Sequence, residues 1–201
     1  MVLISPAATG IAMLSLPVSS QYVLSSLTTG KMMQQAQDNP TEKSTRPRVI
    51  ESLEALGRLA ATEVACSDWQ LIDQARIQRF ADATGDQQWI HTDPERAARE
   101  SPYGSTIAHG YLTLSLLPTI FEACVRIDGV AMSINYGLDR LRFPAPVLAG
   151  QRVRGRLVLD RVEPIDGGVQ AYWSATVEVE HGDKPACAAM MLVRYYLAPV
   201  A

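Results

Sequence analysis

The stretch Ile107–Val125, "IAHGYLTLSLLPTIFEACV", decides the fold. Its apolar residues surround the helix axis instead of forming one stripe, and a helix of this kind is a buried one. Pro118 lies inside the segment, and proline lacks a backbone N–H and clashes with the preceding turn. We therefore predict one long central helix that is buried and kinked near Leu114–Pro118. Its apolar residues are Leu112, Leu114, Leu116, Leu117, Ile120, Phe121, Ala123 and Val125.

Four segments after this helix are typical of β-strands, namely residues 131–143, 151–163, 167–181 and 186–197. In the third of them, every second residue from Val169 to Val179 is apolar, which is the period of a strand. Gly137 interrupts the first, and we expect a β-bulge there. Long antiparallel strands after one buried helix predict an α+β fold, in which a curved antiparallel sheet wraps around the central helix.

The segments before the central helix are shorter. Residues 1–47 are predicted to be a disordered or poorly ordered extension, because residues 34–48 are polar and without periodicity. A start of translation at Met32 or Met33 would remove residues 1–31 from the native chain, and an N-terminal mass would show this. The folded domain is expected over residues 48–201, beginning with a short helix that carries Val49, Leu53, Leu56 and Leu59.

Two further helices have clear ends. Asp73 is a candidate N-cap for the first, and Gly85 is a natural C-terminal stop. Asp93 and Pro94 fit the N-cap and first turn of the second, which ends before Pro102. The residues between Gly85 and Asp93 are expected to form a tight loop.

Composition excludes several classes of function. The net charge of −3 and the lack of a dense Lys/Arg run argue against a nucleic-acid partner. No apolar run approaches the roughly 20 residues of a membrane helix, so no membrane association is expected. Cys66, Cys124 and Cys187 are widely spaced and form no CxxC pair, which argues against a structural zinc site or a disulfide framework and favours buried thiols in a reducing compartment, the cytoplasm.

Asp86 and His91 are the first candidates for chemistry. Five residues of helix separate two side chains by about 140°, and in a strand an odd separation places them on opposite faces. Only a tight loop brings them together, and Trp89 and Ile90 between them would anchor it. An acid and a neutral imidazole that share a water can transfer a proton. Alternatively, Asp86 satisfies loop amides and His91 is a solvated or backbone-bonded side chain.

Gly110 is the second candidate. It would lie in the first turn of the central helix, where free N–H groups and the positive end of the helix dipole favour a ligand oxygen. Without a side chain it permits close approach of a carbonyl. Close packing of the helix explains a glycine there equally well. His109 precedes it and is interpreted as mainly structural.

The segments "FADATGDQQWIHTDPERA", residues 80–97, and "YGSTIAHGYLTLSLL", residues 103–117, together resemble the MaoC-like (R)-specific enoyl-CoA hydratases, which have a hot-dog fold. The likeness extends in order from about Val49 to Tyr196, and "QWIH" is similar to the branch that includes nodulation protein N. Many members have Asn-Pro where this chain has Gln88-Trp89. A serine that lines the site in some members aligns with Pro118, and Ser115 lies one turn earlier.

The resemblance implies roles for these residues. Asp86 and His91 match the dyad that activates one water, and Gly110 matches the glycine whose N–H binds the thioester oxygen. Water would add to a trans-2-enoyl-CoA and give an (R)-3-hydroxyacyl-CoA, without cofactor or metal, in a homodimer. Side chains expected to contact the substrate are Trp89, Ile90, Tyr103, His109 and Tyr111. Among them Trp89, Tyr103 and Tyr111, together with Leu114, are the candidates for lining the acyl tunnel. Arg140 or Arg142 could meet its phosphates or remain solvated.

Three other functions are open at this point. The first is dehydration of 3-hydroxyacyl groups on an acyl-carrier protein (ACP), which shares the chemistry and differs in the carrier. The second is a non-catalytic protein that binds acyl thioesters. The third is thioesterase activity. Release of free CoA would reveal the third, and binding without turnover would reveal the second.

Overall fold

The protein was analysed as a computed structural model, which describes residues 47–198. The predicted extension over residues 1–47 lies outside this range except for Pro47, so it remains a prediction. No helix among residues 47–198 combines the length and hydropathy needed to cross a membrane.

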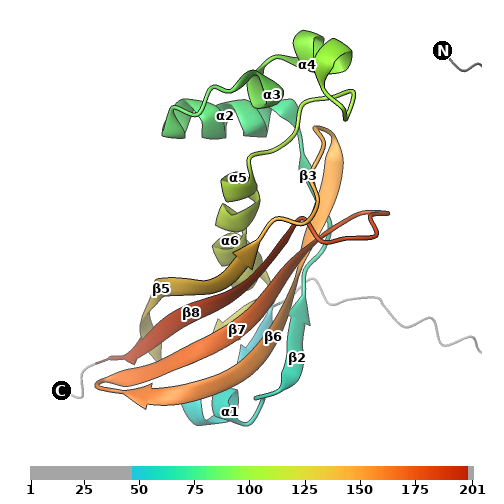
Figure 1. The fold of residues 1–201 in the computed structure, drawn as a ribbon. Coiled ribbons are helices and arrows are strands. Elements are labelled where there is room, and N and C mark those ends of the chain that lie inside the picture. The colour runs from blue at the N-terminus through green and yellow to red at the C-terminus, as the bar shows by residue number, and fades with distance from the viewer. Residues whose placement is uncertain (1–46, 199–201) are drawn as a thin grey trace, which may run out of the picture. The chain divides into compact units, whose positions relative to one another are not determined.

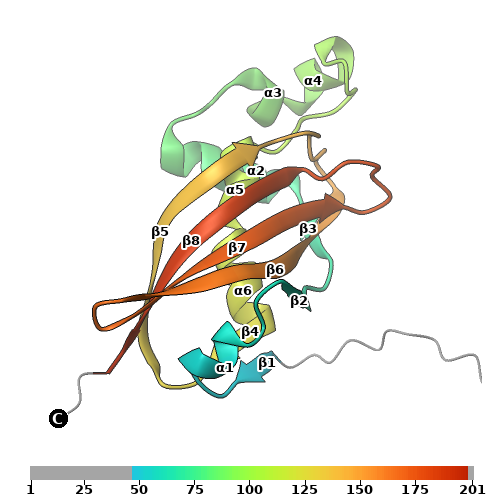
Figure 2. The same cartoon turned by 60° about the horizontal axis from the view of Figure 1, so that its bottom comes forward.

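A curved sheet of six strands forms most of the described chain (Figures 1 and 2). Its hydrogen-bonded neighbours are antiparallel, and β3 adds to β6 beyond the main path. The order along the sheet is β2 (Thr62–Cys66), β6 (Gln151–Ile165), β7 (Gly168–Val179), β8 (Cys187–Leu197) and β5 (Val130–Arg142), with β3 at Gln70–Ile72. The predicted bulge is present, since the register of β5 against β8 shifts between Asn135 and Gly137.

Two short helices lie in the hollow of this sheet, α5 (Gly110–Ser115) and α6 (Leu117–Cys124) (Figure 2). They meet at Leu116, so the predicted break is confirmed, whereas the prediction of one long helix is wrong. Pro118 has no N–H to donate to the carbonyl of Leu114, and the α-helical ladder cannot continue through it. The α+β fold with a sheet wrapped around central helical structure is otherwise as expected.

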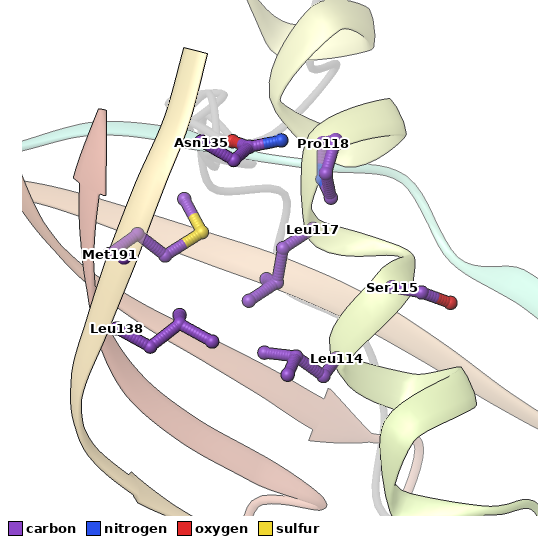
Figure 3. Close-up of a pocket in the computed structure, with 8 residues that line it drawn as sticks. Leu114, Ser115, Leu117, Pro118, Asn135, Leu138 and Met191 are labelled. Atoms are coloured by element: carbon purple, nitrogen blue, oxygen red, sulfur yellow. The ribbon is translucent and has the colours of Figure 1, made fainter. Parts of the chain in front are cut away.

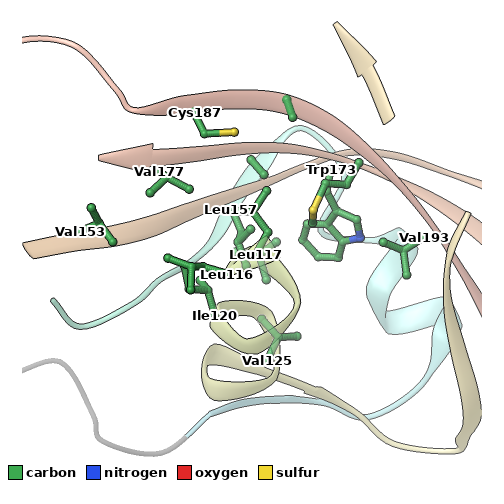
Figure 4. Close-up of a cluster of buried hydrophobic side chains, with 14 of the residues drawn as sticks. Leu116, Leu117, Ile120, Val125, Val153, Leu157, Trp173, Val177, Cys187 and Val193 are labelled. Carbon is green, nitrogen blue, oxygen red and sulfur yellow. The ribbon is translucent and has the colours of Figure 1, made fainter. Parts of the chain in front are cut away.

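The central helices are buried on one side only, which corrects the prediction of a helix buried all round. Leu117 and Ile120 are fully buried against Leu157 and Trp173 of the sheet (Figure 4). On the other side Tyr111 is 68% exposed. A sheet that curves around a helix pair covers only the half that faces it, and nothing in the described chain covers the rest.

The first folded residues differ from the prediction. Arg48–Ile50 form strand β1, which pairs in parallel with β4 (Val125–Ile127), so the helix does not include Val49. Helix α1 (Leu53–Gly57) begins after Ser52, whose hydroxyl accepts a hydrogen bond from the N–H of Ala55. A side-chain cap at this position fixes where the helix starts.

Helix α2 (Gln74–Thr84) has the predicted ends: Asp73 accepts from the N–H of Arg76, and Gly85 has the left-handed φ of 79°. Helix α4 (Pro94–Glu100) is also as predicted, with Asp93 as its N-cap. The expected loop between them instead contains a one-turn helix, α3 (Trp89–Thr92). Helices α2 to α4 lie beyond the α5 end of the central helices (Figure 1).

Replacement of Gly155 by alanine will destabilise the fold. An added Cβ would lie 2.5 Å from Cγ2 of Ile120, inside the core between β6 and α6. Overpacking of this kind costs about 1–3 kcal/mol of unfolding free energy. Urea denaturation measures it.

Gly137→Ala is the matched control, because nothing lies within 4 Å of its added Cβ. Its unfolding free energy should stay within about 0.5 kcal/mol of the parent. Equal destabilisation by the two variants would show that the β6–α6 contact is not what requires glycine at position 155.

Candidate active site

The segment from Thr106 to Ala108 positions α3 and the start of α5 relative to each other. The N–H of Ile107 donates to the carbonyl of Ile90 on α3 at 2.9 Å, and the N–H of Ala108 donates to the carbonyl of Val147 at 2.8 Å. The carbonyl of Thr106 accepts from the N–H of Ala149 at 3.0 Å. These backbone hydrogen bonds on both sides fix the start of α5 against α3.

His91 lies on α3 with its ring turned toward this segment. Its Nδ1 is 2.6 Å from the carbonyl oxygen of Ile107. Because a carbonyl only accepts, Nδ1 carries the proton, and Nε2 is left with a free lone pair. The residue is 7% exposed. The structure thus presents one basic ring atom, in a fixed tautomer.

His109 connects the two predicted dyad residues. Its ring stacks on that of His91, with centroids 3.7 Å apart and an interplanar angle of 26°. Its Nε2 lies 3.0 Å from the backbone oxygen of Asp86 and 3.9 Å from that residue's carboxylate. Phe80 packs on it at 5.0 Å, and the residue is 3% exposed. A buried, hydrogen-bonded His109 fits the structural interpretation.

Asp86, by contrast, has a side chain that is 55% exposed. One ligand atom each from Asp86, His91 and His109 lie within 4.8 Å of one another. The fold therefore gathers the two residues that chain order would separate. No hydrogen bond joins the side chains of Asp86 and His91 among the interactions of residues 47–198, so the two are close without a direct bond.

Burial has the largest effect on the pKa of His91. It lowers the pKa of the imidazole below its ordinary value, and the neighbouring His109 lowers it further. The Ile107 carbonyl and the Asp86 carboxylate act in the opposite direction. Because a buried imidazole is more stable without charge, His91 is neutral at neutral pH and able to accept a proton at Nε2.

Asp86, His91 and His109 together offer three possible metal ligands, the number of protein ligands in a catalytic zinc site. The stacking of the two rings opposes this use, because lone pairs in the planes of nearly parallel rings run side by side. A tetrahedral metal needs them to converge at about 2.1 Å. The cluster of Asp86, His91 and His109 is therefore better suited to a water molecule, and the absence of a metal remains our prediction.

Gly110 is the first residue of α5, where backbone N–H groups lack partners within the helix. A Cβ added to it would lie 2.9 Å from Cδ2 of Phe143. Phe143 in turn makes an edge-to-face contact with Tyr111, at 5.9 Å between ring centroids. Both interpretations of this glycine therefore have support: an available amide at the helix start, and close packing that leaves no space for a side chain.

A cavity of about 200 Å³ lies between the central helices and strands β5 and β8. Leu114, Leu117, Leu138 and Met191 point toward one another across it (Figure 3). Leu114 follows Gly110 by four residues within α5, so the two lie on the same side of that helix. The hydroxyl of Ser115 points away and donates to the carbonyl of Leu112 at 2.8 Å.

The other residues predicted to contact substrate are placed around this site. Trp89 and Ile90 are half-buried, and the guanidinium of Arg96 lies 4.4 Å over the Trp89 ring. Tyr103 and Tyr111 are exposed. Leu114 lines the cavity. Trp89, Ile90, Tyr103 and Tyr111, which all lie in the described part of the chain, do not line it. Their contact with substrate remains a prediction.

Two polar residues near the site were not singled out from the sequence, Gln74 and Thr106. Gln74 donates from Nε2 to the carbonyl of His91 at 2.7 Å, and Thr106 donates to Oε1 of Gln74. A signal for Gln74 existed: it shares the helix face of Ile77 and Ala81, both fully buried, at helical spacing. A polar residue on a buried face needs a partner.

Comparisons with known proteins agree with this geometry. Residues 57–180, more than half of the chain, match the family profile described as MaoC like domain. The chain is 52% identical over 149 residues to 3-hydroxyacyl-thioester dehydratase Z of Mycobacterium tuberculosis, which covers 74% of this chain and 98% of that protein. Nodulation protein N of Rhizobium meliloti is 48% identical over 141 residues, 69% of this chain and 87% of that protein.

Solved structures share the fold at low identity. A MaoC-like dehydratase from Rhodospirillum rubrum aligns with a TM-score of 0.56 and 21% identity, over 68% of this chain and 92% of that one. An (R)-hydratase from Pseudomonas aeruginosa aligns with a TM-score of 0.54 and 20% identity, over 71% and 91%. Together with the profile match, these findings show that the chain belongs to the MaoC-like dehydratase family, hydro-lyases with the hot-dog fold.

Proposed function

We propose that the chain catalyses the reversible addition of water to trans-2-enoyl-CoA, giving (R)-3-hydroxyacyl-CoA. One observation carries the proposal: Asp86 and His91 converge within a cluster 4.8 Å across, beside the helix start at Gly110. A proton acceptor, an acid and an amide donor are the three parts that this reaction needs. The name of the dehydratase relative supports thioester chemistry.

In the hydration direction, the oxygen of a water held by Asp86 and His91 attacks C3 of the enoyl group. One proton of that water passes to Nε2 of His91. Negative charge develops on the thioester oxygen, where the Gly110 N–H stabilises it. C2 then takes a proton from the dyad, so the enzyme ends in its starting state. Dehydration follows the same steps in reverse.

The cavity supports the placement of the acyl group. With the thioester oxygen at Gly110, a chain that extends along the helix would pass Leu114 and enter the space between Leu117, Leu138 and Met191. This lining is mainly apolar, with Asn135 and Ser115 as its polar residues, which suits an alkyl chain.

The carrier is the finer part of the proposal. Dehydration of a 3-hydroxyacyl-ACP uses the same atoms, and a structure of similar fold is named as such a dehydratase complex. We favour CoA as the carrier. We also propose the cytoplasm as the location, since the thiols of Cys66 and Cys187 form no disulfide within the described residues, as in a reducing compartment. Parallel assays with CoA and ACP thioesters decide between the carriers.

Removal of either dyad residue should abolish turnover but not binding. Asp86→Asn and His91→Ala are expected to lower kcat/KM for crotonyl-CoA by about 10²–10⁴-fold, the usual contribution of general acid–base groups. The rate is measured as the decrease in absorbance of the enoyl thioester. Chiral analysis of the product identifies the (R) isomer.

Thermal unfolding and crotonyl-CoA binding by the two variants serve as controls for folding. A parent protein that binds the thioester without turnover would instead establish the non-catalytic function. Release of free CoA would establish a thioesterase.

The rate will depend on the protonation of His91. Burial lowers the pKa of His91. At a solution pH of about 6.5, the pKa of an ordinary histidine, most of the His91 imidazole is therefore still neutral and active. The acid limb of kcat/KM should therefore have its midpoint below that pH, with activity falling as the pH decreases further. A pH profile of hydration measures it, and a midpoint above pH about 6.5 would contradict a buried neutral base.

We further propose that the protein is a homodimer. Strand β5 is an edge of the six-stranded sheet and is 13 residues long. Met132, Ile134, Tyr136 and Leu138 on it are each at least 40% exposed. A long apolar edge strand invites pairing with another chain unless it is covered, and a second copy of this chain would cover it.

Ile134→Lys should convert the dimer into a monomer, because it places a charge in the proposed contact. Analytical ultracentrifugation measures the change. Leu71→Lys is the control, since Leu71 is more exposed than Ile134 (52% against 40%) but lies on β3, away from this edge. A parent protein that sediments as a monomer would exclude the proposed dimer.

A further inference from the structure

Helix α3 has four residues, Trp89–Thr92, and carries the proposed base. A helix this short has no stability of its own in water. The direction of the His91 side chain therefore depends on contacts from other elements. Two hydrogen bonds from other elements involve His91 directly, in addition to the stacking of the His109 ring: the ring bond to the carbonyl of Ile107, and the bond from Gln74 to its backbone oxygen.

The side chain of Gln74 joins α2 to both neighbours. Its orientation follows from its partners, because the His91 carbonyl only accepts and must face the amide NH₂. Oε1 is then directed at Thr106, whose hydroxyl donates to it. Thr106 is 1% exposed, so water does not compete for this bond.

These bonds close a ring around His91. From its backbone oxygen the ring passes through Gln74 to the side chain of Thr106, then along the chain to Ile107, and returns at Nδ1 of the imidazole. His91 is thus held at its backbone by Gln74, which Thr106 orients, and at its ring by Ile107, the residue after Thr106. A residue held at both backbone and ring keeps the direction of its side chain, where one bond would leave it free to rotate.

We propose that Gln74 and Thr106 are positioning residues that hold the proton-accepting atom of His91 in place. This inference rests on the proposed function, in which His91 is the base. Neither residue touches the reacting atoms. Their effect should therefore appear in the chemical step, because a displacement of about 1 Å can cost as much as 10²-fold in rate.

Gln74→Met removes both hydrogen bonds and keeps the length of the side chain. We expect kcat for crotonyl-CoA hydration to fall about tenfold or more, with KM changed by less than about twofold. Gln78→Met is the matched control on the same helix, since among residues 47–198 the side chain of Gln78 bonds only to those of Asp82 and Gln87. It should retain the parent kcat.

Thr106 supplies an independent test of the ring. Thr106→Val should reproduce the loss in kcat, and Thr106→Ser, which restores the hydroxyl, should recover it. Because the two residues act through one chain of bonds, the double variant Gln74→Met/Thr106→Val should be little slower than either single variant. Fully additive losses would overturn the inference.

Proton NMR tests the same idea without substrate. The Nδ1 proton of His91, held by the Ile107 carbonyl, should give a slowly exchanging downfield signal, assigned by its absence in His91→Gln. Gln74→Met should lose this signal and Gln78→Met should keep it. If Gln74→Met retains the signal, the inference is overturned whatever the kcat of that variant. It is also overturned if Gln78→Met loses as much kcat as Gln74→Met.

The inference and the proposed function fail separately. Parent-level kcat in Gln74→Met removes the positioning role and leaves the hydratase in place. A parent protein that turns over no enoyl or 3-hydroxyacyl thioester removes the hydratase, and the NMR signal still decides whether Gln74 holds His91.

Discussion

The backbone hydrogen bonds of Thr106, Ile107 and Ala108 are the constraint on which the site depends. They attach one extended segment to α3 on one side and to the 147–149 turn on the other. Remove them, and His109 and Gly110 at the start of α5 lose their registration with His91. Sheet, central helices and the α2–α4 group thus meet at three residues that act mainly through their backbone, with the Thr106 hydroxyl adding a bond to Gln74.

The same segment explains how two imidazoles can be buried side by side. A charged ring would be costly there, and a second charge 3.7 Å away would be costlier still. The carbonyls of Ile107 and Asp86 accept from the rings without introducing charge. The carboxyl group of Asp86 stays largely in water, so the cluster combines a buried imidazole base with a solvated carboxyl group.

The sequence correctly predicted those helix ends that depend on neighbouring residues, such as caps and prolines. Asp73, Gly85 and Asp93 define α2 and α4 as expected, and Pro118 divides the central helix. Contacts between distant segments left no such signal: His109 meets Asp86 across 23 residues, and Gln74 meets Thr106 across 32. The exposed side of α5 and the strand at Val49 were mispredicted for the same reason, since both depend on what the rest of the fold does or does not cover.

The tautomer of His91 has a stereochemical consequence. With Nδ1 committed to Ile107, a single nitrogen faces the substrate, and Asp86 approaches from the same wall of the site. Under the proposed reaction, hydroxyl and hydrogen would then both arrive from one face of the double bond. Addition would be syn, and in deuterated water a single diastereomer labelled at C2 would form.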